Sequence, residues 1–221
     1  MIRPVEAIGS PLAFISRTHD VALSRRKRLL DVVLASMGLV GLAPLFIFVS
    51  AAIIIDSGWP PLYTQERVGR LGRRFRMWKF RTMRRGAHEL RSALLSRNEA
   101  PFPVFKLHDD PRVTKAGRLL RRSSLDELPQ LWNVVRGEMS LVGPRPPLPE
   151  EVAEYDARAF QRLAVRPGLT CTWQIERRRR DDISFDEWVS MDLAYLEGWR
   201  LQADIRLLLR TVGTVVRMTG E

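Results

Sequence analysis

The sequence predicts a mainly α-helical protein with minor β-structure, a monotopic membrane protein held on one face of the bilayer by a re-entrant helix that a proline breaks. Three observations lead to this prediction. An uncharged apolar run extends from residue 32 to residue 55, Pro44 interrupts it near the middle, and basic residues flank it on both sides. Over the rest of the chain, apolar residues recur mostly at helical spacing.

The apolar run is long enough to cross a bilayer as a straight helix. Its 24 residues would extend about 36 Å, against a hydrocarbon core of about 30 Å. A single-pass anchor is therefore one alternative. Pro44 removes a backbone hydrogen bond and predicts a kink. Basic residues favour the cytoplasmic side, and a helix that turns back at Pro44 leaves both basic flanks there. We expect Asp31, at the entrance, to reach the interface or to pair with an arginine.

The composition limits the class of protein. The chain has 221 residues, 45% of them hydrophobic, and a net charge of +11, so it is not a disordered chain. Most of its basic residues are arginines, which suit bidentate contact with phosphate groups. The single cysteine, Cys171, excludes an intrachain disulfide; we expect it to fill a small position in a cytosol-facing protein. His19, His88 and His108 are not spaced for zinc.

Further elements follow from periodicity. The stretch 199–218 fits an amphipathic helix in the plane of the membrane, with Trp199 at the headgroup level, but it equally fits an ordinary helix packed on a core. The other expected helices are 87–96, 125–135, 149–163 and 185–197, and short strands are expected at 62–65, at 74–79 and near 169–175.

The densest polar segment runs from Asp110 to Pro147 and contains the neighbouring acids Asp126 and Glu127. By spacing alone, Ser124 and Glu127 fit the capping box of a helix start. Arginines crowd just before the acids, and the N–H groups of a helix start bind anions, so the segment also suits a diphosphate. Two neighbouring carboxylates can hold Mg²⁺. The positive surroundings would keep Asp126 ionised, as a carboxylate nucleophile must be.

Five short segments, in this order, carry a family resemblance. They are 79–83 (Lys-Phe-Arg-Thr-Met), 110–114 (Asp-Pro-Arg-Val-Thr), 124–131 (Ser-Leu-Asp-Glu-Leu-Pro-Gln-Leu), 141–146 (Leu-Val-Gly-Pro-Arg-Pro) and 165–170 (Val-Arg-Pro-Gly-Leu-Thr). Together they resemble the bacterial sugar transferase family, the monotopic polyprenyl-phosphate hexose-1-phosphate transferases. The resemblance covers roughly residues 27–218, and the chain is similar to the minimal form, without the extra transmembrane bundle of some larger members.

The resemblance implies an enzyme on the cytoplasmic face of the bacterial plasma membrane, with amphipathic helices on the inner leaflet. It implies that Asp126 attacks the β-phosphate of a UDP-sugar, releases UMP and holds the phosphosugar covalently until polyprenyl (undecaprenyl) phosphate takes it. Asp126 and Glu127 would hold Mg²⁺, or Mn²⁺ in its place. Such a reaction opens the membrane stage of exopolysaccharide, O-antigen, capsule or glycoprotein glycan assembly. The expected division is an extension (1–24), the re-entrant helix (25–58) and a catalytic domain (59–221).

The resemblance also implies basic residues that contact the nucleotide or its phosphates. Arg145, in the Pro-Arg-Pro loop, is the first candidate; the others are Lys79, Arg81, Arg112, Arg122 and Arg166. The chain departs from the family at Ala43, where members often have serine, and over residues 171–180. The sugar therefore stays open among glucose, galactose and hexosamines, and so does the oligomeric state.

Two other functions compete with this interpretation. A nucleic-acid-binding protein would explain the basic charge but not the apolar run, so we expect no nucleic acid partner. A single-pass membrane-anchored basic scaffold that binds anionic lipid or a partner protein would explain both the charge and the run, but not the five segments.

Overall fold

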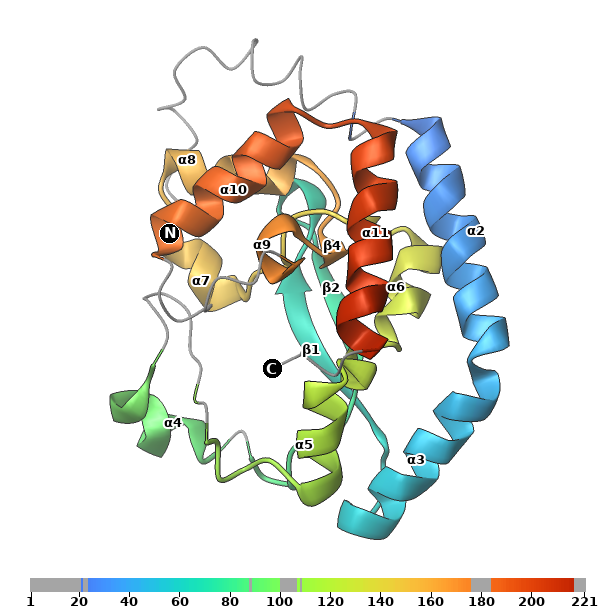
Figure 1. Cartoon of the computed structure of the whole chain (residues 1–221). Coiled ribbons are helices and arrows are strands. Elements are labelled where there is room, and N and C mark those ends of the chain that lie inside the picture. The colour runs from blue at the N-terminus through green and yellow to red at the C-terminus, as the bar shows by residue number, and fades with distance from the viewer. Residues whose placement is uncertain are drawn as a thin grey trace.

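The computed structural model describes residues 21, 24–87, 89–99, 107, 109–175 and 184–216 (Figure 1). Helices surround two small sheets of two strands each. The predicted class, mainly helical with a few strands, is confirmed.

The predicted break at Pro44 separates helix α2 (Arg25–Gly41) from helix α3 (Ala43–Ser57), and the two are bent by 60°. Pro44 is the second residue of α3, where the N–H that it lacks would have no partner within the helix. Among the described helices, none alone has the length and apolarity to cross a membrane, whereas the bent pair taken together does. The break is therefore confirmed, and insertion into one face of a bilayer stays a prediction.

Strands β1 (Leu62–Val68) and β2 (Arg74–Phe80) form an antiparallel hairpin in which Leu62 pairs with Phe80 and Val68 with Arg74. A 3-10 turn, η1 (Arg70–Gly72), joins them. The second sheet is parallel and pairs β3 (Ser140–Val142) with β4 (Gly168–Thr170). The predicted strand near 169–175 is wrong beyond residue 170, because Thr172–Ile175 form helix α9. Strand β3 was not predicted, since three residues are too few to show alternation.

The predicted helix 149–163 is wrong as a single element. The side chain of Asp156 accepts a hydrogen bond from Ala159 N at 2.7 Å and so starts a new helix inside this range. The predicted helix 185–197 is confirmed, with Ser184 and Glu187 as its capping box. The remaining helices are α4 (Arg91–Leu94), η2 (Leu95–Arg97), α5 (Lys115–Arg122), η3 (Leu125–Glu127), α6 (Gln130–Arg136), α7 (Pro149–Ala153), α8 (Ala157–Phe160), η4 (Gln161–Ala164), α10 (Phe185–Glu197) and α11 (Leu201–Val216).

The two halves of the bent pair pack on different apolar clusters. Ala35 of α2 is fully buried in the larger cluster, together with residues of α6, β3 and α10. The smaller cluster contains Val49 and Ile53 of α3, Phe80 of β2 and Leu120 of α5. The bent pair is therefore part of the folded core, and Figure 1 shows α2 along one edge beside α11, with α3 turning below toward α5.

Buried polar contacts fix α2 in this position. Lys27 Nζ donates to Asp204 Oδ2 of α11 at 2.7 Å and to Val142 O of β3 at 3.0 Å. Asp204 also accepts from Tyr195 Oη at 2.6 Å and from Trp199 Nε1 at 3.0 Å. Both charged side chains of this pair are buried, and a buried ion pair is favourable only when such further hydrogen bonds satisfy it.

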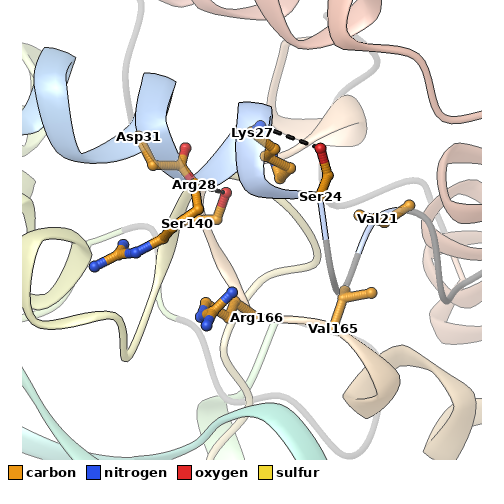
Figure 2. A pocket seen from close by; sticks show the side chains of 8 residues that line it. All are labelled: Val21, Ser24, Lys27, Arg28, Asp31, Ser140, Val165 and Arg166. Atoms are coloured by element: carbon orange, nitrogen blue, oxygen red, sulfur yellow. Dashed lines mark hydrogen bonds between the residues drawn. The ribbon is translucent and has the colours of Figure 1, made fainter.

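Asp31 makes a second buried contact between α2 and β3. It accepts from Ser140 Oγ at 2.8 Å and from Leu141 N at 3.0 Å, and Figure 2 shows Ser140 below the helix beside Asp31. The expectation that Asp31 reaches the interface or pairs with an arginine is therefore wrong. The physical reason is that β3 brings a hydroxyl and a backbone N–H to the buried carboxylate, which satisfies it without a guanidinium.

We predict that Lys27→Met and Asp204→Asn each lower the free energy of unfolding by about 3–5 kcal/mol, because each leaves its partner as an unpaired buried charge. The combined Lys27→Met/Asp204→Asn variant should lose less than the sum of the single changes. Unfolding of the detergent-solubilised chain, followed by circular dichroism, measures these values. Arg26→Met is the matched control at an exposed neighbouring position; an equal loss in Arg26→Met and Lys27→Met would contradict the assignment.

Candidate active site

The neighbouring acids Asp126 and Glu127 lie in the 3-10 turn η3, between the end of α5 and the start of α6. Ser124, which precedes the turn, has a left-handed backbone (φ 55°, ψ 17°), and its side chain caps nothing. The predicted capping box is therefore wrong. An N-cap residue normally takes an extended conformation, but Ser124 N donates to Arg121 O at 3.0 Å and so closes the last turn of α5.

The two acids have different surroundings. Asp126 is buried, whereas the side chain of Glu127 is 29% exposed and accepts from Lys79 Nζ at 2.9 Å. The structure thus brings Lys79, one of the predicted phosphate-contacting residues, to the acidic pair. Two carboxylates in such different surroundings are suited to different chemical tasks.

The turn that carries the acids rests on the second half of the bent helix pair, α3. Leu125 and Leu128, on either side of the acids, pack against the small apolar cluster that includes Val49 and Ile53 of α3. Arg81 holds the end of the same helix, because its Nη2 donates to the carbonyl oxygens of Ser57, at 3.0 Å, and Gly58. The acidic pair therefore lies against α3, and Arg81 has a structural contact at the end of that helix.

One face of the hairpin points toward the acids. Tyr63 of β1 pairs with Lys79 of β2, and Gln65 and Arg67 follow Tyr63 at alternate positions, which places them on the same face. Arg67 is buried; its Nη1 donates to Pro146 O at 2.9 Å and its Nη2 to Gln65 Oε1 at 2.8 Å. Burial lowers the pKa of Arg67 to about 9, and the charge of Arg145 lowers it as well, while Glu151 and Glu127 oppose the shift.

The Pro-Arg-Pro loop lies beside this face. Val68 N donates to Pro147 O at 3.0 Å, and Gly168 N donates to Pro144 O at 2.8 Å. At Gly168 a side chain is excluded, since a Cβ atom would lie 2.1 Å from Gly143 N. Two of the five sequence segments thus meet backbone to backbone. Arg145, in the middle of the loop, has its Nη1 3.7 Å from Glu151 Oε1.

Three other predicted phosphate-contacting residues have different positions. Arg112 is buried in an ion pair with Asp110, with Nη2 and Oδ2 2.6 Å apart. Burial raises the pKa of Asp110, but hydrogen bonds from Arg112 outweigh this and hold the pKa below its ordinary value. Arg122 is exposed at the end of α5. Arg166 donates to Gly137 O at 2.9 Å, at the opposite end of α6 from the acids, and lines a small pocket under the start of α2 (Figure 2).

Arg67 was missed as a site residue by sequence reasoning, which counted it only among the basic residues that flank the apolar run. The signal that could have found it is the alternation of Tyr63, Gln65 and Arg67 on a strand whose partner carries Lys79. Reading that signal requires the register of the hairpin, and the predicted strand stopped at Gln65.

Cys171 has no reactive surroundings. It is buried, and burial raises the pKa of its thiol well above the ordinary value. A thiol rather than a thiolate is therefore present at neutral pH, and it is a weak nucleophile. This agrees with the prediction that Cys171 fills a small position.

The model of the bacterial sugar transferase family matches residues 22–218. The galactosyl transferase CpsE of Streptococcus agalactiae is 42% identical over 209 residues, which cover 95% of this chain and 45% of CpsE. The exopolysaccharide production protein ExoY of Sinorhizobium fredii is 40% identical over 199 residues, covering 88% of this chain and 87% of ExoY.

The name of a third relative includes a sugar donor, a lipid acceptor and the group that is transferred. The UDP-glucose:undecaprenyl-phosphate glucose-1-phosphate transferase of Caulobacter vibrioides is 38% identical over 202 residues, which cover 89% of this chain and 72% of that protein. The chain thus spans less than half the length of the streptococcal relative and most of the length of the other two.

Proposed function

Because the chain belongs to the bacterial sugar transferase family, we propose that it transfers a sugar 1-phosphate from a UDP-sugar to polyprenyl phosphate and releases UMP. The name of the Caulobacter relative includes both a UDP-sugar and undecaprenyl phosphate. The observation that best supports the proposal is the position of Asp126 and Glu127 against α3. A lipid phosphate acceptor lies at the membrane surface, so acids that rest on the membrane helix are suited to meet it.

The same arrangement supports a proposal for where the reaction takes place. The proposed orientation has α2 and α3 entering and leaving the inner leaflet of the plasma membrane on the cytoplasmic side. Both basic flanks then stay on that side, where the positive-inside rule favours them. Nucleotide-sugars are also cytoplasmic metabolites, so the donor would reach the acids from the solvent side.

We assign the nucleophile to Asp126. One oxygen of its carboxylate attacks the β-phosphorus of the donor, and the bond from that phosphorus to the bridging oxygen breaks. UMP leaves with the electron pair of that bond, and the phosphosugar stays on Asp126 as an acyl phosphate. A phosphate oxygen of the lipid then attacks the same phosphorus, and the carboxylate of Asp126 is released.

Glu127 and Lys79 act beside the nucleophile. Glu127 is held by Lys79 at 2.9 Å, which fixes the direction of its carboxylate. The ammonium group of Lys79 also brings positive charge to the place where the phosphates of the donor would bind. Such fixed charges stabilise phosphoryl transfer without having to reorganise during the reaction.

Mg²⁺ is the proposed cofactor. Among the described residues, no group of three or more histidine, cysteine or acidic side chains could hold a metal. The acidic pair fits Mg²⁺ nonetheless, because this ion typically takes one or two carboxylates and completes its shell with substrate phosphates and water. Asp126 and Glu127 would hold it, and when bound it would offset the negative charge of the diphosphate.

We predict that the chain and the correct UDP-sugar, without any lipid acceptor, release UMP in a burst no larger than the amount of enzyme. The radiolabel of the sugar phosphate should remain on the protein. Asp126→Asn should abolish both the burst and turnover, because the amide keeps the shape but is a poor nucleophile. Quenched-flow assay of UMP and counting of precipitated protein measure the two quantities.

Glu127→Gln serves as the companion variant, since it should lower turnover while the attacking atom is still present. The opposing mechanism is direct attack by the lipid phosphate in a ternary complex. Normal turnover with lipid, no burst without lipid and intersecting initial-rate lines would show that mechanism and contradict the covalent one.

We also predict that turnover stops after chelation with EDTA and returns with Mg²⁺ or Mn²⁺, because several negative charges meet at the acidic pair. Circular dichroism of the chelated chain should be unchanged, which separates loss of the ion from unfolding. Undiminished turnover in thoroughly chelated enzyme would contradict the proposed metal site.

A further inference from the structure

Arg67 is a buried cation on the hairpin, near the acids, and its hydrogen bonds all go to uncharged groups. Its side chain is buried, and its Nε, which is closed off from solvent, has no hydrogen-bond partner. The partners of its other two nitrogens, Pro146 O and Gln65 Oε1, are both uncharged. A buried charge that only neutral groups solvate is costly unless an opposite charge lies close.

The nearby negative charge that the protein supplies to Arg67, the carboxylate of Glu151, is shared with Arg145. Arg67 lies close enough to Arg145 for the two guanidinium groups to repel each other, and Glu151 attracts Arg67. Glu151 also faces Arg145 at 3.7 Å, while its Oε2 already accepts from Leu148 N at 2.8 Å. Two arginines thus share one carboxylate, which leaves a net positive charge beside the acidic pair.

An anion that fits this place must come from outside the chain. The side chain of Arg145 is 29% exposed, so it can contact a ligand directly, whereas Arg67 lies beneath it. Glu127 also attracts Arg67 but is held by Lys79. The acidic pair takes the phosphate that is transferred, and the next phosphate of a diphosphate is only one bridging oxygen away. The arginines are therefore suited to the phosphate that stays with the nucleoside.

We infer that Arg67 is a positioning residue in the subsite where Arg145, beside Glu151, is expected to contact the phosphate of the departing nucleoside monophosphate. Arg67 holds the loop through Pro146 O and adds a buried positive charge below the ligand. The inference rests on the proposed function for the identity of the nucleotide. It deepens that function by assigning the leaving group to a set of residues distinct from Asp126 and Glu127.

The test compares UMP with uridine, which lacks the phosphate. Saturation-transfer NMR titrations on the full chain in detergent give both dissociation constants, even at millimolar values. Wild type should bind UMP about ten- to a hundred-fold more tightly than uridine, as expected for charge-assisted hydrogen bonds. Arg67→Met should remove most of this ratio and leave uridine binding unchanged. Arg67→Lys, which keeps the charge, should retain most of it.

Arg74→Met is the matched control. Arg74 lies on the same hairpin, but it is exposed and pairs with the exposed Glu66 at 2.9 Å, so the ratio should stay at the wild-type value. A purely structural contribution of Arg67 would weaken uridine and UMP together in Arg67→Met, and that result would overturn the inference. An unchanged ratio in Arg67→Met would overturn it as well.

Failure of the phosphate subsite and failure of the proposed reaction would give different results. A chain that prefers UMP through Arg67 but releases no UMP from any UDP-sugar with lipid present would keep the subsite and lose the proposed reaction. A chain that turns over normally but binds UMP no better than uridine would keep the reaction and lose the subsite.

Discussion

Two charged side chains on α2 are buried, and the arrangement of the other elements depends on how these charges are satisfied. Lys27 reaches Asp204 on α11, and Asp31 reaches Ser140 and Leu141 on β3. Buried charges have no water to solvate them, so only hydrogen bonds and opposite charges from the folded protein make them tolerable. The start of the bent helix pair is therefore fixed to the sheet of β3 and β4, and the 60° bend after Gly41 directs α3 toward α5 at the opposite end of the molecule (Figure 1).

The position of the acidic pair depends on the position of α3. Its apolar residues support Leu125 and Leu128, so the turn with Asp126 and Glu127 is held at the helix rather than on a free loop. The hairpin adds Lys79 at the acids and Arg67 beneath the Pro-Arg-Pro loop. Positive groups thus lie on the hairpin beside the acids and on the neighbouring loop. The proposed diphosphate donor would meet the proposed nucleophile, Asp126, together with these cations, a charge distribution that favours phosphoryl transfer.

Local features of the sequence predicted part of this arrangement. The break at Pro44, the helix 185–197 and the hairpin strands each depend on neighbouring residues, and the structure has all of them. The partners of Lys27 and Asp31 were beyond sequence reasoning, because Asp204 is 177 residues from Lys27 and Ser140 is 109 residues from Asp31. The predicted capping box at Ser124 was wrong because the pattern considers only neighbouring residues. In the structure, Ser124 closes the last turn of α5 and therefore has a left-handed backbone. The place of Arg67 on the same face as Lys79 could not be predicted without the register of the hairpin strands.

The central claim is that α2 and α3 enter and leave the membrane on one side and so bring the acids to lipid on the cytoplasmic face. Single cysteines at Arg26 and Trp59, both exposed, test it in a Cys171→Ala background. A membrane-impermeant maleimide should label neither position in intact cells and both in inverted vesicles. Labelling of one position but not the other in intact cells would show that the pair crosses the bilayer, and would contradict the account.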